Sequence, residues 1–185
     1  RQAQQLSILS QQDALTGLAN RRYLDEVLEN EWKRSIRHEV PITIMMVDID
    51  SFKLYNDTLG HIQGDQCLRR IAILLGSISS RSGDLAARYG GEEFLLLFSM
   101  TDKDQALIQV QRLMELVRNI AIAHPRSSVS KYVTISVGVA TMIPHLNDSL
   151  SEFISKADHA LYVAKSNGRN QYHIAAIDHT ISETL

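Results

Sequence analysis

The chain has 185 residues, of which 44% are hydrophobic and 22% are charged, and its formal net charge is -2. This composition is typical of one globular domain, and it excludes a disordered segment and a binder of duplex nucleic acid with a broad basic face. The single cysteine, Cys67, excludes an internal disulfide and fits a reducing compartment, and its apolar-periodic surroundings predict buried packing. No segment is long and apolar enough to cross a bilayer, and there is no signal-peptide pattern.

The first half of the chain alternates between helical and strand patterns. After a polar, Gln-rich start that lacks glycine and proline, and a turn over 13–20, Asn20 is placed to cap a helix that Pro41 stops. Residues 42–49 are a nearly unbroken apolar run, which predicts a central strand covered on at least one face. A polar loop is then expected over 50–64.

The second half predicts a hairpin between two helices. Two short strands, 86–89 and 92–98, are joined by Gly90-Gly91, and a two-residue link of this kind favours a primed turn with positive φ. A helix through Leu68 and Ile78 is expected before the hairpin, and a helix through Ala106 and Ile120 after it. A period-two strand over 133–139 then leads to a last helix over about 150–166, which Gly168 ends.

This order, β-α-β-β-α-β followed by a helix, is the ferredoxin-like plan. We therefore expect an α+β domain with a mainly antiparallel central sheet flanked by helices. The expected boundaries are a linker over 1–12, the domain over 13–175 and a tail over 176–185. There is no internal repeat, and the connection over 121–130 is uninformative.

Two aspartates, Asp48 and Asp50, stand at the exit of the apolar strand, and strand period puts them on one face. Carboxylates in such a place repel each other and lose hydration unless a cation compensates, and Mg²⁺ prefers oxygen ligands. The alternative is a solvated loop start with capping aspartates.

The hairpin adds two more acids. Gly90 and Gly91 would let another molecule approach the backbone closely, and Glu92 and Glu93 follow on opposite faces of the strand. The alternative is a turn with solubilising charges at its tip.

Two further groups suit a nucleotide. The carboxylate of Asp65 and the amide of Asn56 offer the acceptors and donors that the Watson–Crick edge of guanine needs, although a helix-start acid and a turn former would look the same. Lys165 and Arg169, at the end of the last helix, could neutralise phosphate or merely favour the helix dipole.

Together these features resemble the GGDEF family of diguanylate cyclases, whose signature GG(D/E)EF is matched at Gly90-Gly91-Glu92-Glu93-Phe94. The resemblance extends from Asp13 to about Tyr172, and one departure is Ser51, where many members carry a bulky residue. Further matches are Asp13-Ala14-Leu15-Thr16-Gly17-Leu18-Ala19-Asn20-Arg21-Arg22, Val47-Asp48-Ile49-Asp50, Phe52-Lys53, Asn56-Asp57, Gly60-His61, Gly64-Asp65, Ser136-Val137-Gly138-Val139-Ala140 and the tail from Lys165 to Asn170.

The resemblance implies a role for each matching residue. It makes Asp48, Glu92 and the Ile49 carbonyl ligands of two divalent ions, Mg²⁺ or Mn²⁺, that bridge the phosphates of GTP. In the same way, the resemblance places Glu93 beside the metal, where it ligates or orients the ion, and makes Glu92 an assisting base. Asn56 and Asp65 read guanine, with His61 in the same loop, and Gly90 and Gly91 leave room for the nucleotide. The phosphate charge is held by Lys53, Lys165 and Arg169, and Lys53 is also a candidate stabiliser of the transition state.

The implied reaction joins two GTP molecules into cyclic di-GMP, by attack of each ribose 3′-hydroxyl on the other α-phosphate. Because one monomer offers one GTP site, two monomers must face each other, and residues 1–12 resemble the end of a signalling helix that would pair them. Arg81-Ser82-Gly83-Asp84 fits the family's inhibitory RxxD motif, with Arg112 as a secondary contact to the product; a surface ion pair is the alternative.

Other functions compete with this prediction. A degenerate member of the family would sense GTP or cyclic di-GMP without turnover. A pure dimerisation module would have turns that only resemble the motif, and a related cyclase would use ATP or accept both nucleotides. The intact acids argue against the first, and the intact substrate residues against the second. Because the chain begins with Arg1, we expect it to belong to a longer cytoplasmic protein, and the sequence leaves open whether a missing N-terminal region tethers that protein to the inner membrane. We expect no nucleic-acid polymer or membrane contact in this segment.

Overall fold

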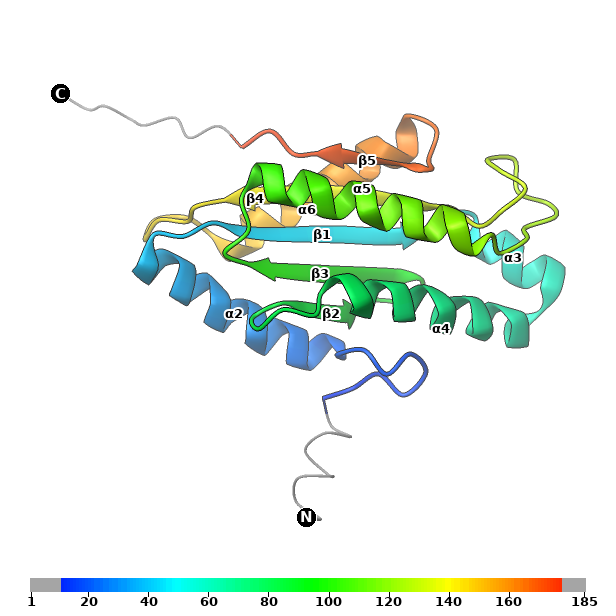
Figure 1. The fold of residues 1–185 in the computed structure, drawn as a ribbon, viewed down its shortest axis with the longest axis horizontal. Helices are drawn as coiled ribbons and strands as arrows, with labels where there is room; N and C mark the ends of the chain where they lie inside the picture. Colours follow the sequence, from blue (N-terminus) through cyan, green and yellow to red (C-terminus); the bar gives the residue numbers. More distant parts are fainter. Residues whose placement is uncertain (1–10, 178–185) are drawn as a thin grey trace, which may run out of the picture.

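The computed structural model describes residues 11–177 (Figure 1), so the helix expected over 1–12 and the tail expected over 176–185 lie mostly outside the described residues. Within this range no helix combines the length and the apolar character that crossing a bilayer requires. In chain order the elements are α2 (Arg21–His38), β1 (Ile42–Ile49), α3 (Phe52–Leu59), α4 (His61–Ile78), β2 (Leu85–Arg88), β3 (Glu93–Ser99), α5 (Lys103–Ile120), β4 (Ile135–Met142), α6 (Leu150–Ser166) and β5 (Gln171–Ile174).

The strands form one sheet in the order β2-β3-β1-β4-β5. The central strand β1 is antiparallel to both β3 and β4, and β2 is antiparallel to β3, which confirms the α+β, ferredoxin-like plan. The fifth strand, β5, runs parallel to β4 and was not predicted, because its four residues Gln-Tyr-His-Ile show no clear alternation.

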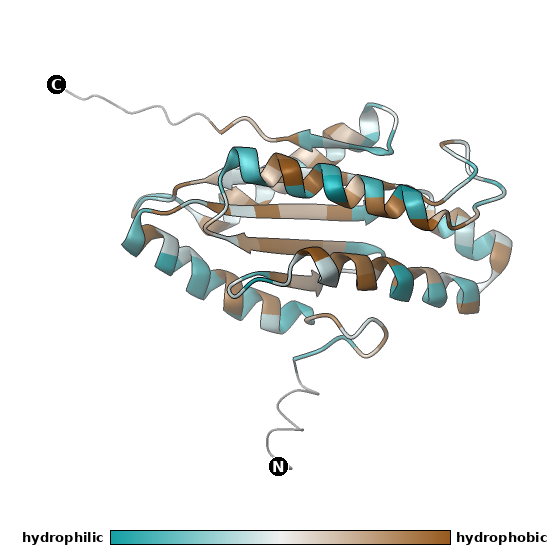
Figure 2. Cartoon of the chain, viewed as in Figure 1, coloured by the Kyte–Doolittle hydropathy of each residue, from teal (hydrophilic) through white to brown (hydrophobic). Residues whose placement is uncertain are grey.

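Helices cover both faces of the sheet. Side chains that alternate along β1 divide between two apolar clusters, one of which includes Met45 and Val47 with residues of α4 and α5, and the other Ile44 and Met46 with residues of α2 and α6. Figure 2 shows the apolar colouring of the central strands between the helices. Cys67 lies in the first cluster, where burial raises the pKa of its thiol to about 11, so the expected packing role is confirmed.

The first described helix begins where its capping residue predicts. The side chain of Asn20 accepts a hydrogen bond from the Tyr23 N–H, and α2 ends before Glu39, which adopts a left-handed conformation with φ 51°. On the face toward the sheet, the ring of Trp32 lies 5.3 Å from that of Phe153 in α6, so these two side chains connect the two helices of this layer.

The loop expected over 50–64 was wrong, because most of it is helical. Phe52 and Tyr55 are buried on one side of α3, three residues apart, and Gly60 separates α3 from α4 with φ 87°. Polar side chains on the other side of α3 conceal its helical spacing in the sequence. This pair of helices begins directly after β1 and carries most of the residues expected to hold the base.

The hairpin expected at Gly90-Gly91 exists, but its turn is not the expected one. The strands end at Arg88 and resume at Glu93, and the N–H groups of Tyr89 and Gly90 both donate to the Glu93 carbonyl. Neither glycine has a positive φ, so the two-residue primed turn was wrong. A Cβ on Gly91 would meet nothing within 4 Å, whereas one on Gly90 would lie 3.3 Å from Glu93 Oε2. The two glycines therefore leave the hairpin tip without side-chain bulk, and they do not supply a left-handed backbone conformation.

Candidate active site

Carboxylates from two neighbouring strands meet at the C-terminal end of β1. Asp48 lies on the same face of β1 as Ile44 and Met46, and the residue of β3 that pairs with it is Glu93. The Lys165 ammonium, from the last turn of α6, lies 3.0 Å from Asp48 Oδ2. Burial raises the pKa of Asp48 to about 6, and although Lys165 opposes this shift, the charges of Glu92 and Glu93 add to it. The site is therefore a partly buried concentration of negative charge.

Glu92 reaches this cluster from just before β3. Its carbonyl accepts a hydrogen bond of 3.3 Å from the Ile49 N–H, which joins the end of β1 to the hairpin. The backbones of the predicted ligands Ile49 and Glu92 are thus adjacent, and a shared ion stays a prediction.

The three carboxylates offer the oxygen ligands that a hard divalent cation prefers. They already attract one positive charge, the Lys165 ammonium beside Asp48. Among residues 11–177, however, no three acidic, histidine or cysteine side chains are arranged closely enough to hold an ion. Some side-chain movement would have to accompany metal binding.

Asp50, expected to share a face with Asp48, has partners of its own. Its 2%-exposed carboxylate accepts hydrogen bonds from the Thr134 hydroxyl at 2.7 Å and the Ser136 hydroxyl at 2.6 Å, and from the Asn170 N–H at 3.0 Å. These bonds tie the end of β1 to β4 and to the segment after α6. Asp50 therefore holds the backbone around the site, while Asp48, which is also buried, pairs with Lys165.

A cleft of about 460 Å³ opens beside these acids. Asn56 lies in it, and its Oδ1 is buried without a hydrogen-bond partner among the described residues, which costs free energy until a donor arrives. Gly64 makes room for this amide, because a Cβ there would overlap Asn56 Oδ1. The lining residues are Phe52, Lys53, Asn56, His61, Asp65, Leu68, Arg88, Gly91 and Glu92. The cleft therefore brings together the residues expected to hold the base with Lys53, Gly91 and Glu92, whereas Asp48, Glu93, Gly90, Lys165 and Arg169 are not among its lining residues.

Arg88 lines the cleft and has a structural role that the sequence did not indicate. Its guanidinium donates to the Gly90 and Gly91 carbonyls, with a shortest distance of 2.8 Å, and to both Asp13 carboxylate oxygens at 3.3 Å. Asp13 also accepts from the N–H and hydroxyl of Thr16. One side chain therefore fixes the hairpin tip against the N-terminal motif, 75 residues away in sequence.

His124 is a second missed residue, from the connection that appeared uninformative. Its ring is 1% exposed, and Nε2 lies 3.1 Å from the Ser51 carbonyl, so that nitrogen carries the proton. The ring also stands edge-on to Tyr55 at 5.2 Å. Ser51 has φ 53°, an unfavourable conformation for a serine, and His124 helps to hold it where β1 turns into α3.

The end of α6 brings two predicted cations, Lys165 and Arg169, to the same end of the sheet, although neither lines the cleft. Lys165 is engaged with Asp48, whereas Arg169 is exposed and has φ 63°. Gly168, Arg169 and Asn170 all have positive φ, a run that Asp50 stabilises by accepting from the Asn170 N–H.

The expected inhibitory residues lie near the other end of β3. Arg81 Nε is 3.4 Å from Asp84 Oδ2, and its Nη2 donates to the buried Thr101 hydroxyl at 2.8 Å. Asp84 in turn accepts from the Ser99 N–H. Arg112 is exposed on α5. Arg81 and Asp84 thus form an ion pair, as the alternative interpretation expects, but the Asp84 side chain is only 1% exposed. Their inhibitory role stays a prediction.

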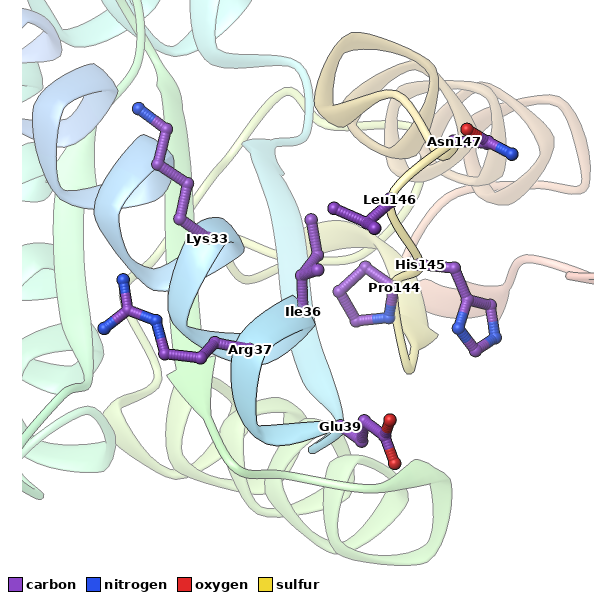
Figure 3. A pocket seen from close by; sticks show the side chains of 8 residues that line it. All are labelled: Lys33, Ile36, Arg37, Glu39, Pro144, His145, Leu146 and Asn147. Atoms are coloured by element: carbon purple, nitrogen blue, oxygen red, sulfur yellow. The ribbon is translucent and has the colours of Figure 1, made fainter.

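A larger hollow of about 670 Å³ lies between the end of α2 and residues 144–147, at the opposite end of the sheet (Figure 3). Lys33 and Arg37 extend away from Leu146 and Pro144, and Glu39 is the one acid among the lining residues. This hollow has no paired acids, so the smaller cleft is the candidate site.

Comparisons with known proteins show which family the chain belongs to. The family described as "Diguanylate cyclase, GGDEF domain" matches residues 10–171. Diguanylate cyclase DgcZ of Escherichia coli (strain K12) is 38% identical over 168 residues, which cover 90% of this chain and 54% of DgcZ. Response regulator PleD of Caulobacter vibrioides is 39% identical over 164 residues, which cover 85% of this chain and 34% of PleD. The chain therefore spans about half or less of these relatives.

A solved structure of the coiled coil and GGDEF domain of DgcB from Caulobacter crescentus, in complex with c-di-GMP, superposes with a TM-score of 0.85. It is 31% identical, and the match covers 94% of this chain and 90% of that one. The match over residues 10–171, the shared fold and the signature at the hairpin tip together establish that this chain belongs to the GGDEF domain family of diguanylate cyclases.

Proposed function

We propose that this domain condenses two GTP molecules into cyclic di-GMP and releases pyrophosphate. The observation that carries the proposal is the acidic cluster of Asp48, Glu92 and Glu93, of which Glu92 lines a cleft that also offers the unpaired amide oxygen of Asn56. Acids that bind metal and a polar pocket that binds a base are the two parts that nucleotidyl transfer needs side by side.

Each residue has a defined task in this proposal. Asn56 and Asp65 hydrogen-bond the guanine edge, and His61 lies at the same mouth of the cleft. Gly90 and Gly91 leave space for the ribose and phosphates against the hairpin tip. The phosphate charge is met by the cations Lys53, Lys165 and Arg169.

Asp48, Glu92 and the Ile49 carbonyl would hold two Mg²⁺ or Mn²⁺ ions, and Glu93 would orient them. When bound, the metal neutralises charge on the phosphates and lowers the pKa of the attacking hydroxyl. Glu92 accepts the proton from the ribose 3′-hydroxyl as that oxygen attacks the α-phosphate, and Lys53 stabilises the charge that develops. The P–O bond to pyrophosphate breaks as the new phosphodiester forms.

One cleft binds one GTP, so the second nucleotide must come from another copy of the domain. Two copies related by a two-fold axis present each 3′-hydroxyl to the other α-phosphate, and the same step occurs twice. The working unit in this proposal is a homodimer, at least transiently.

The proposal is tested by incubating the protein with GTP and Mg²⁺ and separating the nucleotides by chromatography. We expect cyclic di-GMP and pyrophosphate, with Glu92→Gln slower by at least roughly a hundredfold, because the variant loses both a metal ligand and the base. Glu115→Gln, an exposed carboxylate on α5, is the matched control and should turn over normally.

The alternative functions give different results in the same assay. A sensor module would bind GTP or cyclic di-GMP without forming product even at high protein concentration. A cyclase of broader specificity would form product from ATP as well, which would contradict the guanine-reading role of Asp65.

We also propose that the product inhibits the enzyme at Arg81 and Asp84, with Arg112 as a further contact. Arg81 is half-exposed and its guanidinium is already oriented by Asp84 and Thr101, which suits bidentate binding of a phosphate or guanine. Arg81→Ala should weaken inhibition by added cyclic di-GMP by roughly tenfold or more while initial rates stay unchanged. Equal inhibition of both proteins would contradict this site.

A further inference from the structure

Lys165 lies where a divalent ion would have to bind. Its Nζ is 3.0 Å from Asp48 Oδ2, and the side chains are 32% and 9% exposed, so this ion pair is far from a freely solvated one. Three carboxylates contribute negative charge here, while Lys165 is the cation that acts on Asp48. Removing the ammonium without replacement would leave Asp48 buried beside Glu92 and Glu93, which is costly.

The backbone beneath Lys165 is fixed, whereas its side chain is long enough to move. Helix α6 lies tightly on β4, because Gly138 lacks the Cβ that would otherwise overlap the Ala157 carbonyl oxygen. Ala157, Ala160 and Ala164 are buried along this contact. The ammonium can therefore exchange partners by rotation of a flexible four-carbon stem, with no movement of the helix.

We propose that Lys165 is an exchangeable counter-ion, which pairs with Asp48 while no divalent ion is bound and moves to the triphosphate when one enters. The inference rests on the proposed function, because the second partner is the phosphate of the substrate. An ammonium and a divalent ion that share one carboxylate repel each other strongly at such distances, so binding of the ion releases the lysine. The Lys165 ammonium then pairs with the triphosphate of the nucleotide instead of with Asp48.

Such an exchange couples the two ligands. In the nucleotide-free protein a divalent ion must compete with Lys165, so it binds weakly. A triphosphate that attracts the released ammonium makes ion binding easier, and by reciprocity the ion makes nucleotide binding easier. The absence of a preassembled three-ligand group among residues 11–177 agrees with a site that forms only after Lys165 leaves.

The test measures Mn²⁺ binding to the nucleotide-free protein by electron paramagnetic resonance at pH 8, where Asp48 is ionised. Lys165→Met should bind Mn²⁺ roughly three- to tenfold more tightly than the unaltered protein, because the competing cation is gone. Lys156→Met, an exposed lysine on the same helix, is the matched control and should leave the affinity unchanged. The double variant Asp48→Asn/Lys165→Met should bind no more tightly than Asp48→Asn.

Equal or weaker Mn²⁺ binding by Lys165→Met would overturn the exchange. Circular dichroism verifies the fold, and Lys165→Gln, with the same expected sign, replaces the Met variant should that one not fold. The result is separate from the proposed function, which the GTP assay of the unaltered protein tests. Turnover without tighter Mn²⁺ binding in the variant refutes only the exchange, and tighter Mn²⁺ binding without any turnover refutes only the cyclase.

Discussion

At the scale of single residues, the site depends on side chains that join distant segments. Arg88 holds the carbonyl groups of the hairpin tip with one part of its guanidinium and Asp13 with another. Burial alone would raise the pKa of Asp13, but hydrogen bonds from Thr16 and the Arg88 charge hold it below its ordinary value. The N-terminal turn and the hairpin tip are thus connected through the Asp13 carboxylate, which the fold stabilises in its ionised form.

Asp13→Asn tests this connection through pH. Because the pKa of Asp13 is lower in the folded state, its carboxylate stabilises the fold above the unfolded pKa, and the contribution disappears as the pH falls through the folded pKa. We expect the variant to lose about 1 to 2 kcal/mol of unfolding free energy at pH 7 and progressively less toward pH 3, as measured by urea unfolding.

Asp25→Asn is the control, because its ion pair with Arg21 is exposed on both sides, and its effect should stay within about 0.5 kcal/mol. A loss of stability in Asp13→Asn that is the same at every pH would contradict the role of the ionised carboxylate.

The sequence predicts local groups better than long-range partners. Asn56, Asp65 and Glu92 were assigned from motifs, and the structure gathers them around one cleft. Arg88 and His124 were missed because their partners are 75 and 73 residues away, and neither the type of residue nor its neighbours indicates such a contact.

At the scale of elements, α3 and α4 form the wall that would recognise the base. Asn56 stands on α3, and its amide lies against Gly64 in the first turns of α4. Glycine is an unfavourable residue inside a helix, so its presence here needs a reason. The reason is spatial, since a Cβ at position 64 would occupy the place of Asn56 Oδ1.

Gly64→Ala should therefore separate stability from recognition. Alanine favours the helix, and the displaced group is the end of a flexible side chain, so the unfolding temperature should change little or rise. The KM for GTP should increase by roughly tenfold, because the amide of Asn56 is pushed away from the base. Thermal unfolding and steady-state kinetics measure the two effects.

Gly76→Ala, in the same helix, is the matched control, because its Cβ would meet only Leu18 Cδ2 at an ordinary 3.6 Å. It should be as stable or more stable, with an unchanged KM. An unchanged KM in Gly64→Ala would show that the position of Asn56 does not matter for GTP.

The elements with strong periodicity were predicted closely. Helix α6 spans Leu150–Ser166, as expected, and the apolar run at 42–49 is β1. Errors occurred where polar function overrides pattern: α3 carries Lys53, Asn56 and other polar residues along the cleft, so its sequence resembles a loop. The turn at Gly90-Gly91 was wrong because the glycines provide space there instead of positive φ.

At the scale of the whole molecule, the acids, the cleft and the cations all lie at one end of the sheet, where β1 leads into α3 (Figure 1). Lys53, His61 and Gly91 at this cleft are exposed, so a nucleotide bound there would remain open to a second molecule on one side. One domain offers one such cleft for a product that contains two guanosines. The chemistry proposed above is therefore a property of a pair of domains.

This arrangement predicts how activity depends on concentration. While monomers predominate, the rate per domain should rise in proportion to the protein concentration, because only pairs of domains react. Adding an excess of Glu92→Gln to the unaltered protein should suppress product formation, since mixed pairs contain one site that cannot complete its transfer. The same excess of an unrelated protein such as serum albumin controls for crowding. A rate per domain that is independent of concentration, together with no suppression by the inactive copy, would mean that a single domain completes both transfers, and the single cleft of this fold would then have to accommodate both nucleotides in turn.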